Sequence, residues 1–92
     1  MDALALVALN IRKIRVTRGV SQEALAVDAQ VDRTYVSRLE RGMENPTVAV
    51  LARLATALNV DIPQFFVAPI LGEDPPILLK KGRRPLKDRM AK

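Results

Sequence analysis

Helix caps and helix stops divide most of the chain into short segments. Ser21, Asp32 and Thr47 are residue types that favour the N-cap of a helix, and Gly19 and Gly42 favour helix ends. Within the segments, apolar residues recur three or four positions apart, which is the period of a helix and not of a strand. The sequence therefore predicts five short helices, over residues 4–18, 22–29, 33–41, 48–58 and 62–66. The predicted fold class is a compact all-α domain.

Positive charge is concentrated in a few parts of the sequence. The 92 residues have a formal net charge of +5, yet residues 80–92 alone hold seven basic residues against one acidic residue. Seven of the eight basic residues before residue 80 lie in residues 12–18 and 33–41. From residue 68 onward, prolines and glycines accompany the basic run. We expect a helical domain of residues 1–67 and a Pro-containing basic C-terminal arm of residues 68–92 that is disordered.

The composition argues against an enzyme. The sequence contains neither His nor Cys, which removes the commonest general base and the commonest metal ligands. No carboxylate pair, and no nucleophile with a base, can be assembled from the remaining residues. We therefore expect no catalysis, no metal, no cofactor and no small-molecule ligand. The apolar run at residues 3–9 is too short to span a bilayer and lacks the charged leader of a signal peptide, so the expected location is the cytoplasm, without membrane contact.

The third predicted helix has two chemically different faces. At about 100° per residue, one arc of about 140° holds five polar side chains. These are Arg33, Thr34, Ser37, Arg38 and Arg41. The opposite side holds Tyr35, Val36 and Leu39. A guanidinium can donate two parallel hydrogen bonds to guanine O6 and N7, so the polar face suits base reading in the major groove of DNA. The alternative is an ordinary amphipathic helix with a solvated face.

The order and spacing of these segments resemble the phage repressor helix-turn-helix family, the group of lambda repressor, Cro and the xenobiotic-response-element regulators. The resemblance runs from about Asn10 to Phe66 and is carried by NIRKIRVTRGVSQEALA, VDRTYVSRLERG, ENPTVAVLARLATALNV and IPQFF. It implies a compact five-helix DNA-binding domain. In that domain residues 22–29 cross the DNA backbone and residues 33–41 form the recognition helix.

The resemblance also implies roles for single residues. Base edges are the expected contacts of Arg33, Thr34, Ser37 and Arg38. Phosphates are the expected contacts of Gln22, Arg41, the backbone amides around Glu44 and Asn45, and the Tyr35 hydroxyl if its ring does not simply pack inside. For Gln22 the alternative is an exposed place in the first helical turn. Arg15 and Glu40 are expected to pair internally between the first and third helices, the alternative being two unrelated surface charges.

The sequence departs from the family in the turn of the motif. Where the family usually has Gly, this chain has Gln30. A residue with a Cβ loses about 1–2 kcal/mol at a positive φ. Either the turn is altered, or it keeps its shape at a cost in stability.

The last predicted helix suggests how the chain assembles. Phe65 and Phe66 are adjacent, so on a helix their rings point about 100° apart and one is expected to face outward. The predicted homodimer interface consists of Ile62, Phe65, Phe66 and Val67, although both rings could instead close the domain. The expected function is a sequence-specific transcriptional regulator that occupies a palindromic double-stranded DNA operator as a dimer. The alternatives are an antitoxin, a restriction-modification controller, or a protein-interaction module that keeps the fold without reading DNA.

Overall fold

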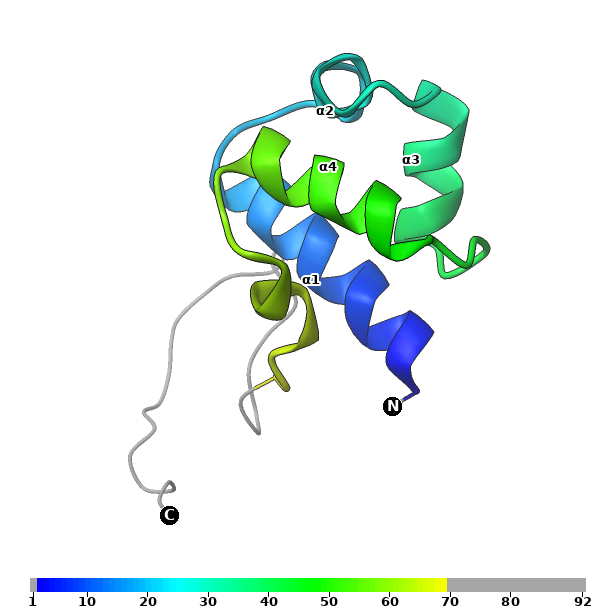
Figure 1. Ribbon diagram of the computed structural model, residues 1–92, viewed down its shortest axis with the longest axis vertical. Helices are drawn as coiled ribbons and strands as arrows, with labels where there is room; N and C mark the ends of the chain where they lie inside the picture. Colours follow the sequence, from blue (N-terminus) through cyan, green and yellow to red (C-terminus); the bar gives the residue numbers. More distant parts are fainter. Residues whose placement is uncertain (1, 70–92) are drawn as a thin grey trace.

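The computed structural model describes residues 2–69, which form four α-helices and one 3-10 helix, with no strand in that range (Figure 1). The α-helices are α1 (Ala3–Thr17), α2 (Gln22–Ala29), α3 (Arg33–Glu40) and α4 (Val48–Leu58), followed by the 3-10 helix η1 (Ile62–Phe66). The all-α prediction is confirmed, and the fifth predicted helix is this short 3-10 segment. No helix within residues 2–69 has the length and apolar character needed to cross a membrane. The predicted basic arm lies, from residue 70 onward, outside the described residues.

Side-chain caps begin three of the four α-helices. The side chains of Asp2, Ser21 and Thr47 each accept a hydrogen bond from the backbone amide three residues further on, at 2.8, 3.0 and 3.1 Å. Each bond satisfies one of the amides that a first helical turn leaves without a partner. Asp32 occupies the N-cap of α3 with an extended backbone, but its side chain makes no capping bond. Local chemistry thus fixes where α1, α2 and α4 begin, while α3 depends more on its packing.

The apolar faces of the helices meet in one core. Its fully or nearly fully buried members are Val7, Ile11, Leu25, Ala26, Ala29, Val36, Leu39, Leu51, Leu54, Ala55, Leu58 and Phe65. Helix α2 packs against both α3 and α4, and η1 packs against α1. Helix α3 contributes only Val36 and Leu39 to the buried set, and Tyr35 packs against this core. Of the remaining α3 residues, Arg33 and Thr34 are exposed and the others are partly exposed. The core therefore holds α3 by one narrow stripe.

A buried amide attaches η1 to α1. Asn10 is 6% exposed, and its Nδ2 donates to the backbone oxygens of Phe65 and Val67, at 2.8 and 2.9 Å. Phe65 is fully buried, whereas Phe66 is 44% exposed, which confirms that one of the two rings faces outward. Asn10 thus fixes the path of the backbone that presents Phe66 and Val67 to solvent.

Candidate nucleic-acid interface

The turn between α2 and α3 keeps its left-handed residue. Gln30 has φ 61° and ψ 47°, and the next amide, of Val31, donates to the Ala26 oxygen at 3.0 Å. This is the bond pattern that closes a helix through one left-handed residue, usually Gly. The sequence left open whether the turn is altered or keeps its shape at a cost in stability, and in the structure it keeps its shape. The turn is regular, and Gln30 occupies a conformation that costs a residue with a Cβ about 1–2 kcal/mol.

An arginine on α4 holds this turn from the other side. The Nε of Arg53 donates to the backbone oxygen of Ala29 at 2.9 Å, which satisfies a carbonyl in the last turn of α2. Sequence reasoning missed this role. The available signal was that Arg53 is the one basic residue before residue 80 that lies outside the two basic stretches.

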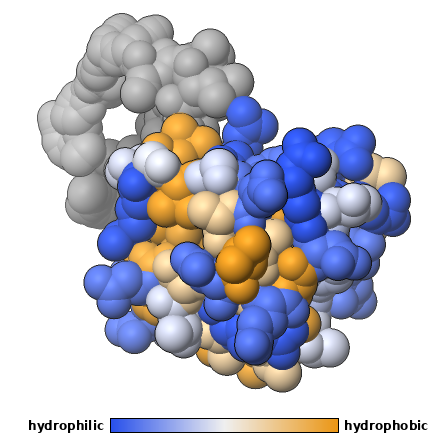
Figure 2. All heavy atoms as spheres, turned by 90° about the horizontal axis from the view of Figure 1, so that it is seen from above, coloured by the Kyte–Doolittle hydropathy of each residue, from blue (hydrophilic) through white to orange (hydrophobic). Residues whose placement is uncertain are grey.

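The polar face of α3 is largely open to solvent. Arg33, Thr34 and Arg41 are exposed, and Ser37 and Arg38 are partly exposed. Seen from above, hydrophilic residues cover much of the molecule, with hydrophobic residues between them and toward the left of the view (Figure 2). The structure therefore leaves all five predicted side chains within reach of a partner. Their contacts with DNA remain predictions.

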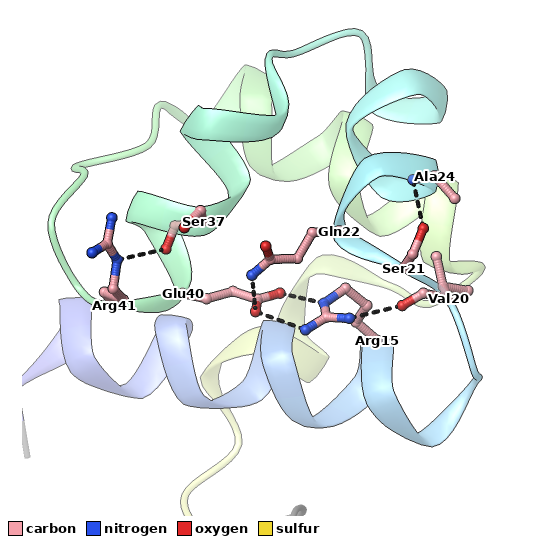
Figure 3. Close-up of polar contacts among 8 residues, drawn as sticks. All are labelled: Arg15, Val20, Ser21, Gln22, Ala24, Ser37, Glu40 and Arg41. Carbon is pink, nitrogen blue, oxygen red and sulfur yellow. Dashed lines mark hydrogen bonds and ion pairs between the residues drawn. The ribbon is translucent and has the colours of Figure 1, made fainter.

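Behind this face, a buried ion pair joins α1 to α3 (Figure 3). Arg15 Nε and Nη2 donate to the two carboxylate oxygens of Glu40, at 2.6 and 3.0 Å, and the side chains are 13% and 3% exposed. Arg15 Nη1 also donates to the Val20 oxygen at 2.8 Å, at the start of the segment leading into α2. A bidentate guanidinium and carboxylate pair fixes both position and angle. The C-terminal end of α3 is thereby held against α1.

Gln22, predicted at a phosphate, belongs to the same network. Its Nε2 donates to Glu40 Oε1 at 3.1 Å, a contact that the sequence did not indicate (Figure 3). An amide nitrogen carries two hydrogens, so one remains for a further acceptor, together with the backbone amides at the start of α2. Gln22 therefore connects the first turn of α2 to the last turn of α3.

A second ion pair also lies at the C-terminal end of α3. Arg38 Nε donates to Glu44 Oε2 at 2.8 Å, and the two side chains are 41% and 29% exposed. Arg38 Nη2 approaches the backbone oxygen of Met43 at 3.4 Å. The Glu44 side chain thus contacts a predicted base-reading residue, whereas the sequence assigned only the backbone around Glu44 and Asn45. Arg41, the C-cap of α3, donates from Nε to the Ser37 backbone oxygen at 3.3 Å.

Tyr35 lies between the pair of Arg38 and Glu44 and the core. Its ring is partly buried and packs against the core cluster, which was the alternative to a phosphate contact of its hydroxyl. Burial raises the pKa of the Tyr35 phenol above its ordinary value of 10.0, the negative charge of Glu44 raises it further, and Arg53 opposes the shift. The α3–α4 loop and α4 therefore approach the same phenol.

The predicted dimer surface is only partly available. Phe66 and Val67 are 44% and 53% exposed, and Ile62 is partly buried. Phe65 is fully enclosed by the core, so its side chain offers nothing to an interface. This corrects its assignment: of two adjacent rings, the small core takes one and leaves the other to solvent.

Residues 11–65 match the helix-turn-helix family, and the chain belongs to that family. It is 41% identical over 68 residues to a hypothetical transcription factor of Neisseria meningitidis, a match that covers 74% of this chain and 64% of that protein.

Solved structures show the same likeness. The crystal structure of the restriction-modification controller protein C.AhdI from Aeromonas hydrophila superposes with a TM-score of 0.67 at 36% identity, over 68% of this chain and 96% of that chain. The controller protein C.Esp1396I, solved as a tetramer in complex with its natural 35 base-pair operator, superposes with a TM-score of 0.66 at 38% identity, over 72% of this chain and 87% of that chain.

Proposed function

We propose that this protein is a sequence-specific DNA-binding transcriptional regulator of the lambda repressor, Cro and xenobiotic-response-element type. The observation that carries the proposal is the polar face of α3, held at a fixed angle by the buried pair of Arg15 and Glu40. A helix fixed in this way can enter the major groove as a rigid reader. The related C.Esp1396I, solved with its operator, supports DNA as the partner.

Phosphate contacts complete the proposed interface. Gln22 and the amides at the start of α2 offer donors at a helix N-terminus, where the dipole favours anions. Arg41 and the loop amides of Glu44 and Asn45 follow the C-terminal end of α3, the end that Gln22 contacts through Glu40. These donors would set the register of α3 on the duplex, while the residues of its polar face select the sequence.

We further propose that the operator is palindromic and is occupied by a homodimer. One recognition helix reads only a few base pairs, and two-fold pairing places two such helices about one DNA turn apart. Phe66 and Val67 supply an exposed apolar surface for pairing. The basic arm that the sequence predicts from residue 68 would add salt-sensitive affinity without selecting a sequence. The proposed location is the cytoplasm, and no reaction is proposed.

A restriction-modification controller is the second candidate. The likeness to C.AhdI, which spans 96% of that controller's chain, favours it. Both candidates bind an operator and differ in the genes controlled. A methyltransferase gene beside this one would identify a controller, and a toxin gene would identify an antitoxin.

The function is tested by selecting bound duplexes from a random DNA pool. We expect enrichment of a two-fold symmetric sequence with half-sites about 10 base pairs apart. Arg33→Ala combined with Arg38→Ala should abolish the enrichment. Arg18→Ala is the matched control, because it also removes a positive charge but lies beside Asn59 and Gln64, away from α3.

A wild-type protein that enriches no sequence would contradict the proposal. It would favour the protein-interaction module instead. Enrichment that survives in the Arg33 and Arg38 double variant would show that DNA is read by another surface.

A further inference from the structure

The ion pair at the end of α3 occupies one edge of the Arg38 guanidinium. Nε donates to Glu44 at 2.8 Å, and Nη2 points one hydrogen toward the Met43 oxygen at 3.4 Å. These two donors form the side edge of the planar group. Three of the five N–H bonds remain, and two of them, one on Nη1 and one on Nη2, lie parallel at the outer end. That outer end is the part that pairs with guanine O6 and N7.

The backbone fixes the position of Glu44 relative to Arg38. Gly42 ends the helix at φ 75°, and the Met43 amide donates back to the Arg38 backbone oxygen at 2.9 Å. The chain therefore turns back over the last turn of α3, and the Glu44 carboxylate reaches the Arg38 side chain from the loop. Both residues of the pair therefore lie within one closed turn of the backbone.

We propose that the Glu44 side chain determines the sequence specificity of this protein by positioning Arg38 for one guanine. The inference rests on the proposed function, since it needs α3 to read DNA. Glu44 holds the side edge of the guanidinium, so the outer edge is presented in one orientation before DNA arrives. An arginine that is already oriented loses less side-chain freedom when it binds. An arginine held in this way also discriminates better between bases, because it cannot move to a new position to bond to a different base.

The charge of Glu44 raises sequence specificity in a second way. A carboxylate near the DNA surface repels phosphates, and this repulsion acts on every sequence alike. On the operator, the contact between Arg38 and guanine offsets this repulsion. On other sequences that contact is not made, so the repulsion is not offset by it. Glu44 thus lowers non-specific binding while it supports the specific contact.

The test measures discrimination in a double-mutant cycle. The variants are Glu44→Ala, Arg38→Ala and both together, and the control is Asp28→Ala, which removes the same charge from an exposed position in the last turn of α2. Each is titrated at one salt concentration against the selected operator, a duplex with the Arg38-dependent guanine pair replaced, and a scrambled duplex. Thermal unfolding of each variant verifies that it is folded.

Four results are expected. Arg38→Ala should lose about 5- to 150-fold of discrimination at one base pair, the fold-change equivalent of one bidentate contact. Glu44→Ala should lose a severalfold part of the same discrimination and bind scrambled DNA more tightly. In the Arg38→Ala background, Glu44→Ala should not change discrimination further. Asp28→Ala should keep full discrimination.

Other outcomes overturn the inference and separate it from the function. If Arg38→Ala loses discrimination and Glu44→Ala does not, Arg38 reads its base unaided, and the protein is still a regulator. If Glu44→Ala strengthens operator binding more than scrambled binding, the pair inhibits reading instead of supporting it. If the wild type prefers no sequence, the proposed function fails together with this inference.

Discussion

At the scale of single residues, two residues within the described range 2–69 occupy the left-handed region without being glycine. Gln30 closes α2 at φ 61°, and Asn59 closes α4 at φ 59°. Asn tolerates this region well because its short side chain bonds locally, whereas Gln does not share that advantage. The two turns are otherwise alike, so Asn59 serves as an internal reference for the conformational strain at Gln30.

We expect Gln30→Gly to stabilise the protein by about 1 kcal/mol. Relief of the left-handed conformation stabilises the folded state by about 1–2 kcal/mol. The new glycine also raises the conformational entropy of the unfolded chain, which cancels part of that gain. For a domain of this size the change should raise the unfolding midpoint by about 4–8 °C. Asn59→Gly is the control and should gain little or nothing. Equal gains in the two variants would show that Gln30 is not strained.

The residue scale also shows what the sequence could predict of the site. The helical period separated the polar face of α3 from Val36 and Leu39, and the structure has that separation. The bonds of Gln22 to Glu40 and of Arg38 to Glu44 were missed. Periodicity reports which way a side chain leaves its helix. It does not report which atoms meet between elements, because that depends on how the elements pack.

At the scale of elements, α3 depends on the pair that links it to α1. Its core contribution is small, and its N-cap side chain makes no bond. Glu40 accepts from both Arg15 and Gln22 and is 3% exposed. Three helices thus meet at one buried carboxylate. Removal of that carboxylate should affect the orientation of α3 more than its helical structure.

Glu40→Ala should lower the free energy of unfolding by about 3–5 kcal/mol, because it leaves the nearly buried Arg15 without its counter-charge. Urea unfolding measures the loss. The double variant Arg15→Met with Glu40→Leu should cost less than the single change, since no uncompensated charge remains. Glu44→Ala breaks a more exposed pair and should cost under about 1 kcal/mol. Similar losses in Glu40→Ala and Glu44→Ala would contradict the structural role of Glu40.

Elements were the most predictable level of this protein. Caps and stops are local signals, and those at Ser21 and Thr47 make the expected bonds. The 3-10 geometry of η1 was not indicated. Pro63 has no amide hydrogen to donate, and the Gln64 amide donates to the Asp61 oxygen three residues back. A short segment with a proline near its start can form either an α-helical or a 3-10 turn. Packing against α1 therefore determines which of the two η1 adopts.

At the scale of the whole molecule, the exposed apolar surface around η1 suggests assembly. Phe66 and Val67 follow directly on the buried Phe65, whose backbone oxygen is bonded to Asn10. The surface is therefore attached to the core and is not a loose end. Large aromatic side chains on such a surface are typical of protein interfaces.

We expect the protein to sediment as a dimer at micromolar concentration and Phe66→Asp to shift it toward monomer. An acidic group in an apolar interface loses its hydration without gaining a partner. Operator affinity should fall with it, because the two half-site contacts are no longer linked. Val48→Asp is the control: it is 73% exposed, and an acid in the first turn of α4 suits the helix dipole. A monomeric wild type would contradict the proposed interface.

The bonds of Asn10 also have a consequence for synthesis of the protein. The carboxamide lies in α1, and its acceptors are 55 and 57 residues later in the chain. At about 5–20 residues per second, a ribosome needs about 3–11 s to add the residues between them. Formation of a helical domain takes far less time, in the range of microseconds to milliseconds. The nascent chain therefore waits for translation: Asn10 stays hydrated, and the part of α1 that η1 covers stays exposed, until residue 67 has left the ribosome.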